Sequence, residues 1–253
     1  PLFDLLPLSG CNITMPHKQT AYSIADEHDF SAAITESANT LTYNGKLKSF
    51  NTDFLAFQKL LNSNGKLQTG GSALVIGSGN TANTVIRALR KFNIEISLLN
   101  RTKINSDILK SEFPEINVIE TNEIADSYDL LVNAIPDTSF LFDSLRSKKF
   151  DTVVDFNYIK NELLYLKNNC SNFIDGYQIL ISQALFAFDI YTDNRFELVA
   201  KQYDNILPIL HSKISSPKAK KSNIVLVGFT GTGKTEIGRA LANKLGKSFA
   251  DTD

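Results

Sequence analysis

The chain has 253 residues, which suggests one or two domains at roughly 150 residues each. Its 26 Lys and Arg residues balance 27 Asp and Glu residues, which excludes a strongly basic surface for nucleic acid or membranes. No apolar run reaches the ~20 residues of a membrane span. The two cysteines form no CxxC motif and no Cys/His cluster, so we expect neither a metal site nor a disulfide framework, and a cytoplasmic location.

The chain divides into segments with different patterns. Residues 1–68 mix apolar stretches with the loops GCNITMPHK and SFNTDF. Residues 69–175 alternate strand, glycine turn, amphipathic helix and strand, and the runs DLLVNAI and DTVVDF fit buried parallel strands. This pattern predicts an α/β fold with a doubly wound, Rossmann-type sheet. Residues 176–210 favour helices that fold back on the first segment, and residues 211–222 favour an exposed linker.

The glycine turn GSGNTA follows a predicted strand and opens a helix, where backbone N–H groups can receive a pyrophosphate. Gly77 permits a tight turn, Gly79 allows close backbone approach, and Ala82 holds the position of a small packing residue. The candidate cofactor residues of this turn are Gly77, Ser78, Gly79, Asn80, Thr81 and Ala82. Glycine-rich turns also occur in sheets that bind nothing, so the motif alone leaves that alternative open.

The end of the next predicted strand indicates which dinucleotide would bind. An NAD site usually places Asp or Glu about 20 residues after the glycines. Here Asn100, Arg101 and Thr102 occupy the strand end. No carboxylate is present to repel a ribose 2′-phosphate, and the Arg101 guanidinium favours one. The sequence therefore predicts NADP as the cofactor.

Two residues of the first segment are candidates for proton transfer. Pro16 favours an extended residue before it and a rigid loop, from which Lys18 projects. Asp53 lies among apolar residues in FNTDF. A lysine and a carboxylate in one cleft could move a proton during carbonyl reduction. The alternatives are a solvated Lys18 and an Asp53 that caps the following helix, and sequence spacing does not decide between them.

The order of the motifs NITMPHK, ANT, NTD, GSGNTA, NRT, VNAIP and DGYQILISQALFAF resembles the shikimate dehydrogenase family over roughly residues 8–210. The resemblance implies that residues 1–68 are part of a substrate-binding domain and residues 69–175 an NADP-binding domain. It implies a catalytic pair, Lys18 and Asp53, and hydride transfer from NADPH to 3-dehydroshikimate with Lys18 as the proton donor. The implied substrate contacts are Thr14, Asn39, Tyr158 and Gln183, and Gly176 is implied on the nicotinamide side.

The sequence also departs from the family pattern. Asn80, Ser49 and Ala56 replace expected glycines, and Ile179 replaces a frequent methionine. The resemblance implies a further N-terminal strand-and-helix segment, with a serine pair for the substrate carboxylate, and we expect residues 1–253 to lack it. We therefore expect cofactor binding but weak turnover, together with an unpaired sheet edge and exposed apolar surface.

Residues 223–253 carry a second nucleotide motif. The glycines, lysine and threonine of G-x-x-x-x-G-K-T follow a predicted strand and precede a helix, which predicts a P-loop for the phosphates of ATP. These residues are Gly228, Gly231, Gly233, Lys234 and Thr235. The segment is similar to the beginning of shikimate kinase, which implies Mg²⁺ ligation by Thr235 and Asp251 and a substrate contact by Asp253. We expect a truncated kinase domain without kinase activity, from a multifunctional enzyme that joins dehydrogenase and kinase.

Other functions remain open at this point. The same scaffold can serve a quinate/shikimate dehydrogenase, which a comparison of the two polyols would distinguish. A non-catalytic NADP-binding regulator is a further alternative, although it leaves the presence of both Lys18 and Asp53 unexplained. A separate nucleotide phosphatase is the weakest alternative, because most of the P-loop domain is missing. A small-molecule substrate is expected as partner, and the sequence does not indicate the oligomeric state.

Overall fold

The computed structural model describes residues 9–63, 70–158 and 162–215, and residues 239–240, 242–243 and 248–249 near the end of the chain. The chain separates into two compact units, Pro1–Ser215 and Ser216–Asp253. The predicted P-loop and kinase residues lie outside the described residues; they are Gly228, Gly231, Gly233, Lys234, Thr235, Asp251 and Asp253. None of the helices in the described ranges is both long and apolar enough to cross a bilayer.

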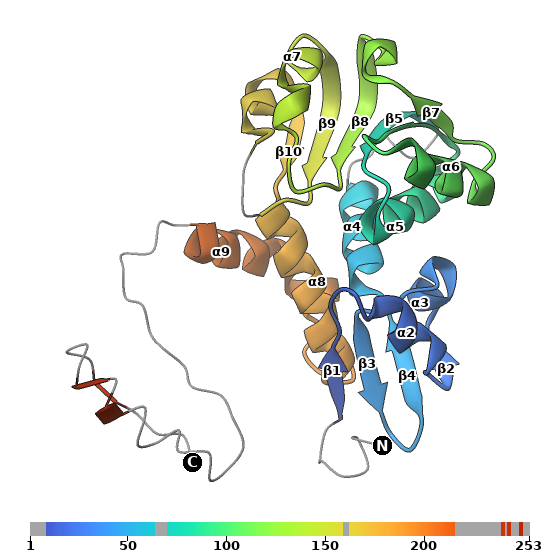
Figure 1. Cartoon of the computed structure of the whole chain (residues 1–253). Helices are drawn as coiled ribbons and strands as arrows, with labels where there is room; N and C mark the ends of the chain where they lie inside the picture. Colours follow the sequence, from blue (N-terminus) through green and yellow to red (C-terminus); the bar gives the residue numbers. More distant parts are fainter. Residues whose placement is uncertain are drawn as a thin grey trace. The chain divides into compact units, whose positions relative to one another are not determined.

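A four-stranded sheet forms the first part of the Pro1–Ser215 unit (Figure 1). Its order is β1-β3-β4-β2, and its strands are β1 (Gly10–Asn12), β3 (Thr40–Tyr43), β4 (Leu47–Phe50) and β2 (Glu27–His28). The β1–β3 and β3–β4 pairs are antiparallel, and β2 pairs with β4 in parallel. The short helices α2 (Lys18–Ser23) and α3 (Phe30–Thr35) connect the strands. Buried Ala21, Ala38 and Leu41 form the small core on this sheet.

Helix α4 (Thr52–Ser63) leads from this sheet to the rest of the unit. Its first turn is capped by Asn51, whose Oδ1 accepts a hydrogen bond from the Phe54 N–H at 3.1 Å. The sequence left open a capping role for Asp53, but Asn51 performs that role, so the Asp53 carboxylate is available for other contacts. Phe54 and Phe57 are fully buried in the main core.

A six-stranded parallel sheet forms the second part of the unit, with the order β10-β9-β8-β5-β6-β7. Its strands are β5 (Gly71–Ile76), β6 (Ile94–Leu99), β7 (Asn117–Ile119), β8 (Ser127–Asn133), β9 (Lys149–Asp155) and β10 (Asn172–Ile174). The chain moves outward in both directions from β5, so the strand order reverses between β5 and β8. The predicted α/β fold with a doubly wound, Rossmann-type sheet is confirmed.

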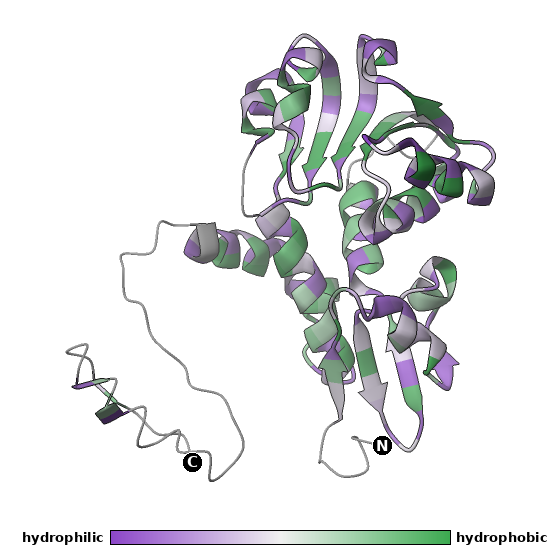
Figure 2. Cartoon of the chain, in the orientation of Figure 1, coloured by the Kyte–Doolittle hydropathy of each residue, from purple (hydrophilic) through white to green (hydrophobic). Residues whose placement is uncertain are grey.

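Both faces of the parallel sheet are covered, which explains its nearly continuous apolar strands. Alternate residues of β5 belong to different hydrophobic cores, one on each face of the sheet. Ala73 and Val75 pack with α4 and with helix α5 (Asn80–Leu89). Leu74 and Ile76 pack on the opposite face with helix α7 (Phe142–Leu145). Hydrophobic residues predominate along the inner strands, whereas the outer helix α6 (Lys103–Glu112) alternates between hydrophobic and hydrophilic residues (Figure 2).

Helix α8 (Gly176–Tyr191) runs from the parallel sheet back to the four-stranded sheet and packs beside α4 (Figure 1). A π-helix (Leu198–Gln202) and helix α9 (Tyr203–Ser215) follow it. The sequence placed the start of a linker at residue 211, but α9 continues to Ser215. Composition was misleading here because the polar side chain of His211 is hydrogen-bonded to Asp175, with Nε2 and Oδ2 2.8 Å apart.

Candidate active site

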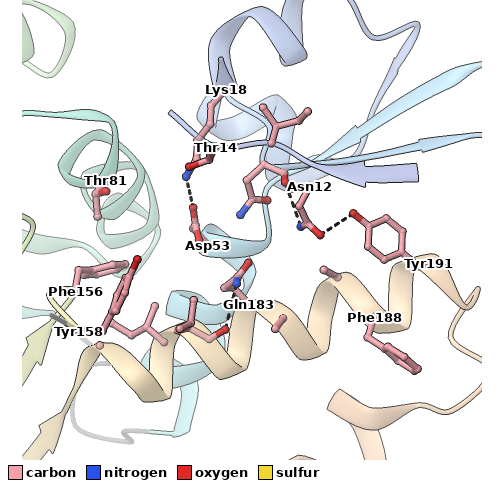
Figure 3. Close-up of a pocket in the computed structure, with 17 residues that line it drawn as sticks. Asn12, Thr14, Lys18, Asp53, Thr81, Phe156, Tyr158, Gln183, Phe188 and Tyr191 are labelled. Atoms are coloured by element: carbon pink, nitrogen blue, oxygen red, sulfur yellow. Dashed lines mark hydrogen bonds and ion pairs between the residues drawn. The ribbon is translucent and has the colours of Figure 1, made fainter. Parts of the chain in front are cut away.

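A cleft of about 640 Å³ lies where the four-stranded sheet, helix α8 and the carboxyl edge of the parallel sheet meet (Figure 3). Its lining includes all six residues predicted to bind substrate or to catalyse, namely Thr14, Lys18, Asn39, Asp53, Tyr158 and Gln183. Thr81 and Gly176, two of the predicted cofactor residues, line the same cleft. The cleft therefore joins residues from the parts of the chain around both sheets and from helix α8.

The centre of the cleft holds an ion pair between Lys18 Nζ and Asp53 Oδ2, which are 2.7 Å apart. The two side chains are only 18% and 26% exposed. Lys18 begins helix α2 and Asp53 lies in the first turn of α4, so two separate elements hold the pair. The ammonium has three N–H donors, and one is directed at Asp53, so the others can serve a ligand in the cleft.

Backbone hydrogen bonds hold the loop before Lys18. The His17 N–H donates to the Thr14 carbonyl at 3.0 Å, and the Ala38 N–H donates to the Lys18 carbonyl at 2.9 Å. Pro16 lies in this turn. These contacts hold Thr14 and Lys18 at one wall of the cleft, as the rigid loop expected from the sequence would require.

A hydrogen-bonded chain connects the polar residues beside the ion pair. Asn39 Oδ1 accepts from the Thr52 N–H at 2.8 Å and from Thr52 Oγ1 at 3.1 Å. The single hydrogen of Thr52 Oγ1 can instead be donated to Gln183 Oε1, also at 3.1 Å, which joins α4 to α8 while the Thr52 N–H keeps its bond to Asn39. Because the Asn39 oxygen is engaged by Thr52, its Nδ2 group is the end available to a ligand. No role was predicted for Thr52, although it stands between Asn51 and Asp53 in the NTD motif.

The glycine turn lies at the carboxyl end of β5. Gly77 has φ +110°, and its N–H donates to the Leu99 carbonyl at 2.8 Å. A Cβ at Gly77 would come within 2.6 Å of Ile135 Cγ2. By contrast, a Cβ at Gly79 would meet no heavy atom within 4 Å, so open space lies above the residue that precedes helix α5. Fully buried Ala82 packs below the turn, and Ser78 and Asn80 complete it.

The predicted 2′-phosphate residues follow the adjacent strand. Strands β5 and β6 pair in parallel, with Ile76 opposite Leu99, so Asn100, Arg101 and Thr102 emerge next to the glycine turn. Asn100 Nδ2 donates to the Thr102 carbonyl at 2.8 Å and shapes the turn that begins α6. Arg101 and Thr102 are exposed. Their position at this edge suits contact with the ribose end of a dinucleotide.

Tyr158 and Gly176 meet at the start of α8. A Cβ at Gly176 would come within 2.6 Å of the Tyr158 nitrogen and 2.9 Å of its Cα. Glycine at this position is therefore explained by the close packing of the two backbones, and its predicted cofactor contact remains a prediction. The Tyr158 side chain is 45% exposed and faces the cleft.

Three departures from the family pattern have local explanations. Ser49 is buried, and its Oγ lies 2.8 Å from His28 Nδ1, a contact that connects β4 to β2. Ala56 is fully buried in α4. Ile179 lines the cleft, so an apolar contact is kept there without methionine.

Sequence reasoning missed two buried polar residues at the carboxyl ends of β8 and β9. Asn133 Nδ2 donates to Asp155 Oδ1 at 2.8 Å, and the Asn157 N–H donates to the same oxygen at 2.9 Å. Burial raises the pKa of Asp155 to about 6, against these two hydrogen bonds, and the nearby carboxylates of Glu162 and Asp175 raise it further. The sequence signal for these two residues was their position: Asn133 lies near the end of the apolar run DLLVNAI, and Asp155 near the end of DTVVDF.

Replacement of Asp155 by asparagine is expected to stabilise the protein at neutral pH. Because the folded-state pKa lies above the value of 3.8 usual for an aspartic acid in the unfolded chain, the native state binds more protons between about pH 4 and 6, and stability falls as pH rises through that window. Asparagine keeps an acceptor for both hydrogen bonds without the charge. We expect a gain of roughly 1–3 kcal/mol near pH 8 that disappears near pH 4, measured by urea unfolding. An equal effect of the substitution at both pH values would contradict this.

A Rossmann-type sheet with a glycine turn, joined by one cleft to an ammonium–carboxylate pair, is typical of dinucleotide-dependent oxidoreductases. Comparisons with known proteins define the group more closely. The family model of the shikimate dehydrogenase substrate binding domain matches residues 3–41. The shikimate dehydrogenase (NADP(+)) of Bartonella tribocorum is 34% identical over 205 residues, which cover 74% of this chain and 71% of that protein. The corresponding protein of Aquifex aeolicus is 32% identical over 198 residues, covering 75% and 73%.

Solved structures agree with this assignment. The crystal structure of shikimate dehydrogenase from Aquifex aeolicus matches with a TM-score of 0.66 and 29% identity, covering 76% of this chain and 74% of that one. The Thermus thermophilus enzyme in complex with NADP(H) and shikimate matches with a TM-score of 0.62 and 27% identity, covering 73% of each chain. The chain belongs to the shikimate dehydrogenase family.

Proposed function

We propose that this chain is an NADP-dependent oxidoreductase that reduces 3-dehydroshikimate to shikimate and catalyses the reverse oxidation. The Lys18–Asp53 pair in the cleft carries the proposal, because it places a proton donor beside the edge where a dinucleotide would lie. The relatives named as NADP(+)-dependent, and the Thermus thermophilus complex with NADP(H) and shikimate, support the same cofactor and substrate.

The residues present fit a dinucleotide. The open space above Gly79 leaves room for a pyrophosphate at the start of α5, and Arg101 stands at the adjacent strand end. When bound, the nicotinamide ring supplies the hydride for reduction or accepts it for oxidation. All other roles fall to side chains of this chain. Thr81 and Gly176 line the cleft on the side from which the ring would enter.

In the reduction, the substrate carbonyl carbon gains a hydride and its oxygen gains a proton, which yields the alcohol. We assign the proton donation to Lys18 Nζ, and Asp53 orients the ammonium and balances its charge. In the oxidation, Lys18 in its neutral form takes the hydroxyl proton. Polar groups for the substrate's other oxygens come from Thr14, Asn39 and Gln183. Tyr158 lies in the same cleft, close to the carboxyl edge of the parallel sheet, where the cofactor would bind.

Replacement of Arg101 by alanine is expected to reduce the preference for NADP over NAD by about 10- to 100-fold, since a charge-assisted contact to the 2′-phosphate is lost. The value of kcat with saturating NADP should change little, because Arg101 does not line the substrate cleft. The measurement is kcat/KM for each cofactor, with Arg146, a solvent-exposed arginine at the end of α7, replaced by alanine as the control. Unaltered discrimination in the Arg101 variant would contradict the assigned role.

The proposed function is tested by following NADPH formation with shikimate, with quinate and without substrate. We expect turnover with shikimate that exceeds turnover with quinate. Faster quinate oxidation would favour the quinate/shikimate dehydrogenase alternative, and NADP binding without any turnover would favour a regulator. The same assay tests the expectation of weak turnover.

We further propose that residues 223–253 begin a nucleotide-binding domain similar to shikimate kinase. The G-x-x-x-x-G-K-T pattern of Gly228–Thr235 supports this proposal. Lys234 would contact the outer phosphates of ATP, and Thr235 with Asp251 would hold Mg²⁺. A coding sequence whose reading frame stops directly after Asp253 would rule out a kinase domain in the same polypeptide.

A further inference from the structure

We propose that Tyr191 is a positioning residue that fixes the Asn12 side chain and thereby strengthens binding of the polyol substrate. This inference rests on the function proposed above. Tyr191 Oη donates a hydrogen bond to Asn12 Oδ1 at 3.0 Å, between residues 179 positions apart in the sequence. Both residues line the cleft, on the far side of Gln183 from Thr81 and Phe156 (Figure 3). The sequence predicted no role for either residue.

The Tyr191 ring packs with one edge against strand β1 at the end of helix α8, and the residue as a whole is 37% exposed. A Cβ at Gly10 in strand β1 would lie only 2.7 Å from Tyr191 Cε1 and 3.0 Å from Cδ1. The glycine therefore makes room for the ring, and the ring places the hydroxyl oxygen beside Asn12. Burial raises the pKa of Tyr191 to about 12, so the hydroxyl keeps its proton at neutral pH and remains a donor.

The hydrogen-bonding capacity of Asn12 is almost fully used by the protein. Its Nδ2 group donates to the Asn39 carbonyl at 3.3 Å and to Thr40 Oγ1 at 3.2 Å, which accounts for both amide hydrogens. Its Oδ1 accepts the Tyr191 proton and keeps one acceptor site. The group that Asn12 can offer to a ligand is therefore an acceptor, which suits a substrate hydroxyl and not a carboxylate.

The Tyr191 hydroxyl and the Asn39 carbonyl together orient the Asn12 amide. The tyrosine proton requires the amide oxygen at that position, and the Asn39 carbonyl requires the amide nitrogen at the other. Without the tyrosine hydroxyl, the two contacts of Nδ2 remain but the amide oxygen loses its donor, so the Asn12 side chain is held less firmly. Asn39 is itself a predicted substrate contact, so the same arrangement connects two polar groups of the cleft wall.

Replacement of Tyr191 by phenylalanine tests this directly, because the ring remains against Gly10 and only the hydroxyl is removed. We expect the KM and Kd for shikimate to rise about 3- to 10-fold, the range for one lost hydrogen bond. The kcat and the KM for NADP should stay within about twofold, since the Lys18–Asp53 pair is untouched. Initial rates give the kinetic constants, and calorimetric titration gives the Kd for shikimate.

Tyr203→Phe is the matched control. The Tyr203 hydroxyl also contacts helix α8, through Ser182 Oγ, but Tyr203 belongs to the apolar cluster of α8 and α9 outside the cleft. Its removal tests whether any loosening of α8 weakens substrate binding, and we expect an unchanged KM for shikimate. An equal rise in both variants would overturn the assignment to Tyr191.

The remaining outcomes separate this inference from the proposed function. Shikimate oxidation and binding by the unaltered protein, with the same KM and Kd in Tyr191→Phe, would overturn the positioning role alone. Failure of the unaltered protein to bind or oxidise shikimate would overturn both. A selective rise in KM and Kd in Tyr191→Phe supports the inference.

Discussion

Replacing Lys18 with methionine is expected to lower kcat for shikimate oxidation by about 10²- to 10⁴-fold, the contribution usual for a positioned acid or base. Methionine has a similar length but carries no proton, so the cleft keeps its volume while Asp53 loses the ammonium 2.7 Å away. The Asp53 side chain is 26% exposed, so water can solvate the carboxylate and the fold should survive. Steady-state rates and the unfolding temperature separate catalysis from stability.

Lys46→Met provides the matched control for this prediction. Lys46 Nζ pairs with Glu27 Oε1 at 3.2 Å in the same part of the chain, but the side chains are 70% and 48% exposed and lie outside the cleft. Its loss should leave kcat unchanged, because an exposed ion pair contributes little and touches no ligand. A Lys18→Met enzyme with near-normal kcat would remove Lys18 from the mechanism, and an equal loss in both variants would indicate a general electrostatic effect.

The fold was predictable where local pattern and tertiary environment agree. The apolar run before GSGNTA becomes β5, and α5 begins at Asn80, within that motif and directly after Gly79. Helix α8 begins at Gly176, as the segment DGYQILISQALFAF indicated. Each of these elements is buried on the face that its sequence pattern marks. The predicted start of the linker at residue 211 was wrong, because composition does not reveal that His211 is hydrogen-bonded to Asp175, 36 residues earlier in the chain.

The arrangement of the site was less predictable, because it depends on contacts between distant segments. The NTD motif illustrates this. Asn51 caps α4 and also donates through Nδ2 to Thr35 Oγ1 at 2.9 Å, while Thr52 connects Asn39 to Gln183. Only Asp53 faces Lys18. Three adjacent polar residues thus have three different partners, and a sequence in which any of them could cap a helix does not show which one does.

The same limit applies to Tyr191 and Asn12, whose contact spans 179 positions. Tyr191 lies in a segment that read as an apolar helix, and nothing in that segment distinguishes a packed ring from one that donates a hydrogen bond. Gly10 was equally uninformative, because glycine in a short strand is explained by many kinds of close approach. The contact emerges only when β1 and the end of α8 lie together.

Replacing Gly79 with valine is expected to abolish most NADP binding while leaving the fold intact. The residue has φ −84°, which valine adopts without strain, and its added Cβ would meet no atom of the protein within 4 Å. We therefore expect a change of less than about 1 kcal/mol in the free energy of unfolding. The space that the side chain would enter is the one assigned to the pyrophosphate, so the Kd for NADP should rise at least about 10- to 100-fold.

Gly77→Val separates a binding effect from a folding effect. At Gly77 the backbone has φ +110°, and a Cβ would lie 2.6 Å from Ile135 Cγ2. Valine there should cost roughly 2–4 kcal/mol of stability from strain and overpacking, and weaken NADP binding as a consequence. Urea unfolding and calorimetric titration measure the two quantities independently. If Gly79→Val bound NADP as tightly as the unaltered protein, the open space above α5 would have to serve something other than the dinucleotide.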